Sequence, residues 1–151
     1  MLDLLMHLVG KFDEVKSFVS NLYWKGDVED NVFALFKNNK GQVASLHSTM
    51  TQWKHIFSLE IFMEQGYIVL NGLKTSTNSY GEENLTIAMS RTQAPAATWN
   101  EHKQYTFRID DSWELELTIF RDAIIEDHDI EICGIEDGIQ LMEMVDKVYS
   151  Q

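Results

Sequence analysis

The sequence has little cysteine and little proline, and each scarcity excludes a class of protein. Its 151 residues include one cysteine, Cys133, so neither an intrachain disulfide nor a cluster of thiolate metal ligands is possible. The single proline, Pro95, and the eight glycines argue against long linkers and low-complexity tracts. A lone cysteine fits a reducing cytoplasm. We interpret Cys133 as a small apolar residue on a short strand.

Positive charge is also scarce, because 12 Lys and Arg residues face 24 Asp and Glu residues, giving a formal net charge of −12. The basic residues are scattered, whereas nucleic acids and anionic membranes attract clustered Lys and Arg. We therefore expect no nucleic-acid partner and no membrane partner. The apolar start, Met1 to Val9, is too short to span a bilayer and lacks the basic flank of a signal peptide. A cytoplasmic protein is expected.

Motifs for nucleotide binding, nucleophilic catalysis and metal binding are missing. No Gly-x-Gly-x-x-Gly loop, Gly-x-Ser-x-Gly elbow, Cys-x-x-Cys pair or His-x-x-x-His pair occurs. The acidic clusters around Asp27–Asp30 and Glu126–Asp129 have the composition of solvated loops. We therefore expect no catalytic residue, no cofactor-binding residue and no metal ligand in this chain.

The residues that are present can build one domain. Hydrophobic residues make up 44% of the chain, which is enough for a core, and the length is typical of a single domain over 1–151. Apolar spacing predicts a helix over Leu2–Val9, stopped by Gly10. No Ser, Thr, Asp or Asn precedes this helix to cap its N–H groups. We therefore expect that upstream sequence is missing.

The middle of the chain has the alternation and turn signals of antiparallel strands. Asn38, Asn39 and Gly41 mark a tight turn, which predicts a hairpin of Asn31–Lys37 with Gln42–Thr51. A loop is expected over Thr92–Lys103. The other predicted strands are Val15–Trp24, a second hairpin of Ile56–Met63 with Tyr67–Leu70, then Leu85–Met89 and Gln104–Ile109.

Two helices close the chain, each after a capping-box signature. The first signature is Asp111–Glu114 and the second is Asp137–Gln140, with an extended link over Ile130–Cys133 between the helices. We expect one apolar core stripe on each helix. The stripes are Trp113, Leu117, Phe120 and Ile124 on the first helix, and Ile139, Met142, Val145 and Tyr149 on the second.

This order predicts an α+β fold, with an open, largely antiparallel β-sheet and helices packed on one face. The other sheet face must be solvated or covered by a partner or ligand. Indole rings stack on the C–H surfaces of sugars, so the tryptophans are candidate sugar contacts. Trp53 and His55, at a strand end among polar neighbours, are the strongest candidates for substrate binding. His47 and Thr49, on the strand itself, are weaker ones.

Six segments, in their order along the chain, resemble the C-terminal domain of the glucose–fructose oxidoreductase, inositol dehydrogenase and rhizopine-catabolism (Gfo/Idh/MocA) family. Leu2–Gly10 is similar to the end of the family's "His-x-x-Asp-leucine…Gly" helix, with Asp3 at the aspartate. The other segments are the acidic turn Glu29–Ala34, the hairpin strand Gly41–Ser48, the glycine segment Glu64–Leu70 with its first glycine lost, the helix Trp113–Ala123 and the closing helix Asp137–Ser150.

The resemblance implies a dihydrodipicolinate-reductase-like C-terminal domain that binds a sugar-type substrate and forms a homo-oligomer through its sheet face. It also implies a parent NAD(P)-dependent dehydrogenase whose Rossmann domain and catalytic lysine lie outside this chain. The family's catalytic histidine would precede Met1, so the chain alone is expected to be inactive. NAD or NADP is expected in the parent and no cofactor in this chain. The alternatives are a free-standing dimerising interaction module and a small-ligand-binding module.

Overall fold

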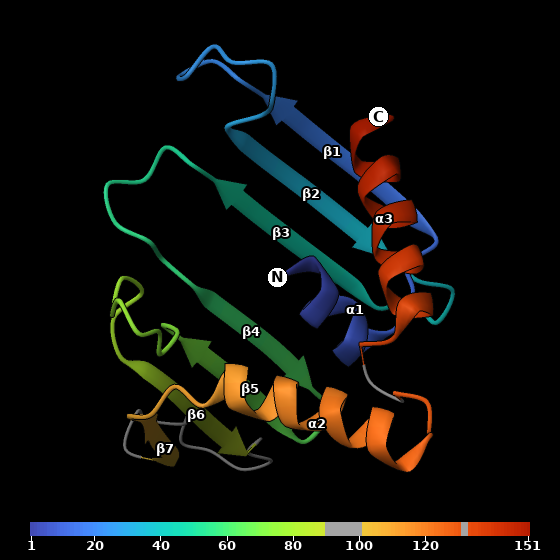
Figure 1. The fold of residues 1–151 in the computed structure, drawn as a ribbon. Helices are drawn as coiled ribbons and strands as arrows, with labels where there is room; N and C mark the ends of the chain where they lie inside the picture. The colour runs from blue at the N-terminus through green and yellow to red at the C-terminus, as the bar shows by residue number, and fades with distance from the viewer. Residues whose placement is uncertain (90–100, 131–132) are drawn as a thin grey trace. The chain divides into compact units, whose positions relative to one another are not determined.

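The computed structural model describes residues 1–89, 101–130 and 133–151. Within these ranges the chain forms three helices and seven strands (Figure 1). The chain divides into two compact units, Met1–Thr51 with Ile119–Gln151 and, as the second unit, Gln52–Thr118. In chain order the elements are α1 (Leu2–Val9), β1 (Glu14–Ser20), β2 (Asn31–Lys37), β3 (Val43–Thr49), β4 (Ser58–Met63), β5 (Gly66–Asn71), β6 (Glu83–Met89), β7 (His102–Phe107), α2 (Ser112–Glu126) and α3 (Ile135–Tyr149).

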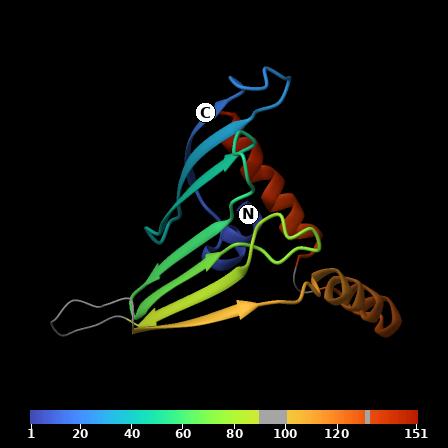
Figure 2. The same ribbon diagram turned by 90° about the vertical axis from the view of Figure 1, so that its left-hand side faces the viewer.

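The first unit contains a three-stranded antiparallel sheet in the order β1-β2-β3. Alternate residues of the central strand β2 are buried on one face: Val32, Ala34 and Phe36. Helix α3 lies along β1 on this face, as the turned view of Figure 2 shows, and Ser17 Oγ donates a hydrogen bond to the carbonyl oxygen of Val148. The opposite face of the sheet has no helix against it among the described contacts of this unit.

The core of this unit is built around aromatic and aliphatic side chains that water does not reach. Phe12 and Phe36 are fully buried and their ring centroids lie 5.2 Å apart. Met144 and Val148 of α3 are buried as well, as is Leu5 of α1. Because buried apolar area stabilises a fold at roughly 25 cal/mol per Å², these residues hold the sheet and both helices together.

Helix α1 ends where the sequence predicts. The backbone N–H of Gly10 donates to the Met6 carbonyl at 2.7 Å, and Gly10 has a φ of 91°. Such a backbone conformation favours glycine, since it has no Cβ to collide with the carbonyl. The predicted hairpin of β2 and β3 is also confirmed, with Gly41 (φ 83°) in its turn.

The second unit contains a four-stranded antiparallel meander in the order β4-β5-β6-β7. The predicted hairpin of β4 with β5 is confirmed. One transverse row of this sheet is polar on all four strands and consists of Ser58, Asn71, Asn84 and Thr106. Ser58 Oγ donates to Asn71 Oδ1 at 2.8 Å, and Thr106 Oγ1 donates to Asn84 Oδ1 at 2.7 Å. The next row, Leu59, Leu70, Leu85 and Tyr105, is apolar and faces the other side.

The predicted α+β class and antiparallel pairing are confirmed, but the strands are divided between two sheets. Strand β3 is the last strand of the first sheet and β4 the first of the second, and residues 50–57, which form no strand, connect them. Strand β1 ends at Ser20, since Asn21–Trp24 form a turn, and β7 starts earlier than predicted, at His102. Most of the loop expected over Thr92–Lys103 lies outside the described residues.

The predicted helix stripes are wrong. On α2, Trp113 is 74% exposed, and Leu117, Phe120 and Ile124 are exposed too, whereas Ala123 is the buried residue. On α3 the buried residues are Met144 and Val148. Of the predicted stripe, Val145 is half-buried, whereas Ile139, Met142 and Tyr149 are exposed. Helical spacing fixes which residues share a face, but it does not decide which face the rest of the chain covers.

The start of α3 also differs from the prediction. The helix begins at Ile135 after Gly134, and the Asp137 carboxylate accepts a hydrogen bond from the Gly134 N–H at 3.0 Å. Asp137 is therefore the third residue of the helix and not its N-cap. From this position its carboxylate still caps the N-terminus, as in a capping box. Cys133 is exposed with a φ of 60°, unlike the apolar strand residue that we predicted. Residues 131 and 132 of the expected link lie outside the described residues.

Candidate functional site

The four residues predicted to bind substrate fall in different units. His47 and Thr49 lie on β3 in the first unit, whereas Trp53 and His55 lie in the segment before β4 in the second. Each pair is therefore described within its own unit.

His47 forms part of an exposed aromatic surface on the sheet of the first unit. Its ring stacks on Phe33 of β2, with centroids 4.0 Å apart and planes 8° from parallel. Its Nε2 atom lies 3.0 Å from Asn31 Oδ1. Phe18, which pairs with Phe33 across the strands, is 82% exposed. The polar edge of His47 is thus engaged within the sheet, and the residue offers mainly an aromatic face.

Thr49 has its hydroxyl occupied by neighbours in the chain. Thr49 Oγ1 donates to the Asp30 carbonyl at 3.1 Å and accepts the backbone N–H of Thr51 at 3.1 Å. These bonds fix the exit of β3, so Thr49 acts on local structure and offers little to a ligand.

Asp30 is buried, which corrects its prediction as a solvated loop charge. Its side chain is 4% exposed, and its Oδ2 atom accepts the backbone N–H groups of Tyr23 at 2.7 Å and Trp24 at 3.0 Å. A buried carboxylate needs such donors. Trp24 Nε1 also donates to the carbonyl of Met50 at 3.2 Å. Asp30 therefore holds the β1–β2 loop in shape.

His55 contacts an aromatic residue that the sequence did not indicate, Tyr80. The His55 and Tyr80 rings have centroids 4.9 Å apart and planes 30° from parallel, while Trp53 is 98% exposed. Tyr80 lies in the loop between β5 and β6, far from His55 in sequence. The sequence offered one signal for this residue, since Tyr80 is an aromatic residue next to Gly81 in an otherwise polar segment. Only the fold shows that the two rings are adjacent.

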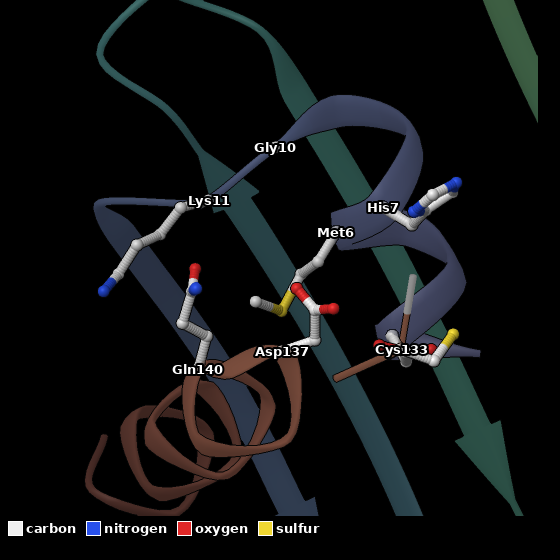
Figure 3. Close-up of a pocket in the computed structure, with 8 residues that line it drawn as sticks. Met6, His7, Gly10, Lys11, Cys133, Asp137 and Gln140 are labelled. Atoms are coloured by element: carbon white, nitrogen blue, oxygen red, sulfur yellow. The ribbon is translucent and has the colours of Figure 1, made fainter. Parts of the chain in front are cut away.

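A small cavity lies between α1 and the start of α3 (Figure 3). It encloses about 120 Å³ and is lined by Asp3, Met6, His7, Gly10, Lys11, Cys133, Asp137 and Gln140. Asp137 is engaged with the Gly134 N–H at 3.0 Å, and Lys11 Nζ lies 3.2 Å from Glu143 Oε2. Two of its charged groups, Asp137 and Lys11, are therefore paired with residues of the chain.

Two carboxylate-linked hydrogen bonds shift pKa values. The Ser112 hydroxyl donates to Asp110 at 2.7 Å and lowers the pKa of that carboxyl. A hydrogen bond to the Glu29 carboxylate raises the pKa of the Tyr149 phenol. Tyr149 is exposed and Asp110 is half-buried, and each shift is explained by its hydrogen bond. Among the described residues no group of three His, Cys, Asp or Glu side chains could hold a metal ion. None of the described helices is long and apolar enough to cross a membrane.

Residues 1–69 match a protein family described as the GFO/IDH/MocA C-terminal domain. No curated protein matches the sequence. Among solved structures, levoglucosan dehydrogenase in complex with NADH and levoglucosan is 21% identical, with a TM-score of 0.74. UDP-N-acetylglucosamine 3-dehydrogenase from Acidithiobacillus ferrooxidans is 19% identical, also with a TM-score of 0.74. The WlbA dehydrogenase from Bordetella pertussis, in complex with NADH and UDP-GlcNAcA, is 19% identical with a TM-score of 0.68.

Each of these three matches covers 99% of the present chain, but only 45%, 43% and 39% of the respective relatives. The chain therefore spans less than half the length of the dehydrogenases that it resembles. The predicted resemblance to the C-terminal domain of this family is confirmed, by sequence over residues 1–69 and by fold over nearly the whole chain.

Proposed function

We propose that this chain, with its Gfo/Idh/MocA C-terminal domain fold, is the substrate-binding and subunit-contact part of a nicotinamide-dependent sugar or nucleotide-sugar oxidoreductase. One observation carries the proposal: the chain shares its fold with sugar and nucleotide-sugar dehydrogenases over nearly its whole length, and residues 1–69 carry the family's sequence pattern. The exposed rings of Trp53 and His55 support a sugar-binding role, because aromatic faces complement the C–H face of a sugar.

The residues of this chain do not fit a dinucleotide. A Rossmann site needs a glycine-rich turn between a parallel strand and a helix. All strand pairs of the described residues are antiparallel, and no two glycines stand two apart in the sequence. We therefore assign NAD or NADP to another part of the parent protein and derive no hydride step through these residues.

The outer face of the β1-β2-β3 sheet supports the subunit-contact role. Phe18, Phe33 and Leu35 on this face are 82%, 49% and 57% exposed. The face carries Lys16 and Lys37 against one acid, Glu14, although the whole chain has a net charge of −12. Charge repulsion between two copies is therefore weak at this face, and apolar area would be buried on contact.

Sedimentation velocity tests the subunit contact. The chain should sediment as a dimer or larger, and Phe18→Glu should shift it toward monomer. Leu22→Glu, at a similarly exposed position in the β1–β2 loop, should leave the oligomer unchanged. A wild-type chain that stays monomeric at high concentration would refute this part of the proposal.

Calorimetry tests the division of labour between substrate and cofactor. Levoglucosan, N-acetylglucosamine and UDP-N-acetylglucosamine are titrated into the 151-residue chain, and NADH is titrated separately. At least one sugar compound should bind, whereas NADH should not bind tightly. Tight NADH binding would contradict the proposed division, and no binding by any sugar compound would contradict the substrate role.

A further inference from the structure

Two segments of the second unit meet at one end of its sheet. The first is the approach to β4, which carries Trp53 and His55, and the second is the loop between β5 and β6. The Gly72 N–H donates to the carbonyl of Phe57 at 2.9 Å, and Phe57 is buried. The backbone of one segment is thereby bonded to the other, which brings Tyr80 to His55.

Gly72 makes this join possible. Its φ is 72°, and a Cβ added there would lie 2.1 Å from the carbonyl oxygen of Glu82. The two ends of the β5–β6 loop therefore approach more closely than any residue with a side chain allows. The Lys74 N–H also donates to Glu83 Oε2 at 2.8 Å. The base of the loop is thus fixed by hydrogen bonds from its backbone, and the loop itself carries Tyr80 against His55.

The tip of this loop carries a chain of hydroxyl groups. Thr75 Oγ1 lies 3.3 Å from Thr77 Oγ1, and Thr77 Oγ1 lies 2.9 Å from Ser79 Oγ. A hydroxyl has one donor and two acceptor positions, so each can bind a further hydroxyl outside this chain. Thr77 and Ser79 are exposed, and Ser79 precedes Tyr80 directly. Aromatic faces and hydroxyl groups therefore occur together.

The charges around this end of the sheet indicate a neutral ligand. The chain segments at this end carry four acids, Glu82, Glu83, Asp110 and Asp111, against three basic residues, Lys54, Lys74 and Arg108. A phosphate or carboxylate would meet these acids, whereas a neutral sugar ring would not. A site with aromatic faces and a few polar groups is typical of small-molecule recognition.

We infer that Trp53, His55, Tyr80 and the hydroxyls of Thr75, Thr77 and Ser79 form a binding site for the neutral pyranose ring of the substrate. This inference rests on the proposed function and locates its sugar contact. The apolar face of the ring stacks on the His55–Tyr80 pair, and its hydroxyls bond to the Thr77 and Ser79 hydroxyls. Tyr80 is a ligand-binding residue of this site, additional to the two that the sequence indicated.

NMR titration of the 151-residue chain tests the site, with N-acetylglucosamine, UDP-N-acetylglucosamine and UMP as probes. N-acetylglucosamine should shift the Trp53 indole N–H, the Tyr80 ring and the Thr77 methyl resonances. UMP should leave them in place. Tyr80→Leu should weaken the binding of N-acetylglucosamine by about tenfold, as expected for the loss of one stacked ring. Tyr80→Phe should retain most of the affinity, because the ring face remains.

Trp24→Leu is the matched control, since it removes an exposed aromatic ring from the first unit and should not change sugar affinity. Unchanged spectra of the β4–β7 strands would show that Tyr80→Leu keeps the fold. Equal sugar binding by the wild type and Tyr80→Leu overturns this site but leaves the proposed function standing. Shifts caused by UMP alone overturn the neutral-sugar assignment, and no binding by any probe overturns both proposals.

Discussion

The carboxylate of Asp30 accepts the backbone N–H of Trp24 at 3.0 Å, and through this bond a buried charge supports an exposed aromatic loop. The Trp24 ring is 66% exposed and contacts the Tyr23 ring edge-on, with centroids 5.0 Å apart. The loop thus exposes two aromatic rings to solvent, while hydrogen bonds to the buried Asp30 carboxylate fix its backbone.

Asp30→Ala should therefore destabilise the protein. It leaves the N–H groups of Tyr23 and Trp24 without their acceptor, and a loss of about 1–3 kcal/mol in the free energy of unfolding is expected. Asp30→Asn should lose less, because the amide oxygen still accepts. Urea unfolding measures both. Asp27→Ala, at an exposed position in the same loop, should stay within about 0.5 kcal/mol of wild type; a similar loss there would show that the hydrogen bonds are not the cause.

Substitutions at Gly72 and Gly81 distinguish two costs of adding a side chain, the strain of a positive φ and the steric collision of the new Cβ. Both have a positive φ, 72° and 78°, but only at Gly72 would a Cβ meet another atom within 4 Å. Gly81→Ala should cost about 1–2 kcal/mol of stability from backbone conformation alone. Gly72→Ala should cost clearly more, since the Glu82 carbonyl must move. Thermal unfolding of the two variants compares them directly, and equal losses would contradict the collision.

Met144 and Met142 distinguish the buried face of α3 from the exposed one. Met144 is 1% exposed and Met142 is 58% exposed. Met144→Ala should lose about 2–5 kcal/mol because it leaves a cavity in the core. Met142→Ala should stay within about 0.5 kcal/mol of wild type. Denaturant unfolding checks the pair, and a larger loss at Met142 would restore the stripe expected from the sequence.

The Tyr149 phenol and the Glu29 carboxylate are linked, and their link should be visible in a pH titration. The hydrogen bond to Glu29 raises the pKa of Tyr149 above its value in the unfolded chain, about 10. Its contribution to stability is therefore present below that unfolded pKa and is lost as the pH rises through the folded pKa.

Glu29→Ala should lower the Tyr149 pKa toward the ordinary value, as followed by the ring carbon resonances of Tyr149. Asp27→Ala removes a neighbouring acid of the same loop and should change the pKa less. If both variants shift the phenol equally, general loop charge rather than the hydrogen bond sets its pKa.

The sequence predicted the elements that local chemistry determines. Gly10 ends α1 as expected, and the turn between β2 and β3 forms where Asn38 accepts the N–H groups of Lys40 and Gln42. These signals act within a few residues, so a single sequence contains them. The acceptor role of Asp137 belongs to the same class, although its position was misjudged.

Long-range packing was beyond the sequence. The stripe through Trp113 on α2 has helical spacing, yet nothing in that spacing determines whether it is covered. We predicted Asp30 to be a solvated loop charge, because its hydrogen-bond donors, Tyr23 and Trp24, reach it only after the loop folds back. Tyr80 was missed for the same reason, since its contact with His55 joins segments on different sides of a hairpin.

The polar row Ser58, Asn71, Asn84 and Thr106 has a consequence for how the four-stranded sheet finds its alignment. A strand that slips by one residue turns its apolar side chains outward and is penalised at once. A slip by two residues keeps every apolar side chain on its own face, so hydrophobic patterning barely opposes it. The side-chain hydrogen bonds of Ser58 with Asn71 and of Thr106 with Asn84 are lost in such a slip. The polar row therefore specifies the strand register, because it favours one alignment of the strands among several that the apolar pattern alone would allow.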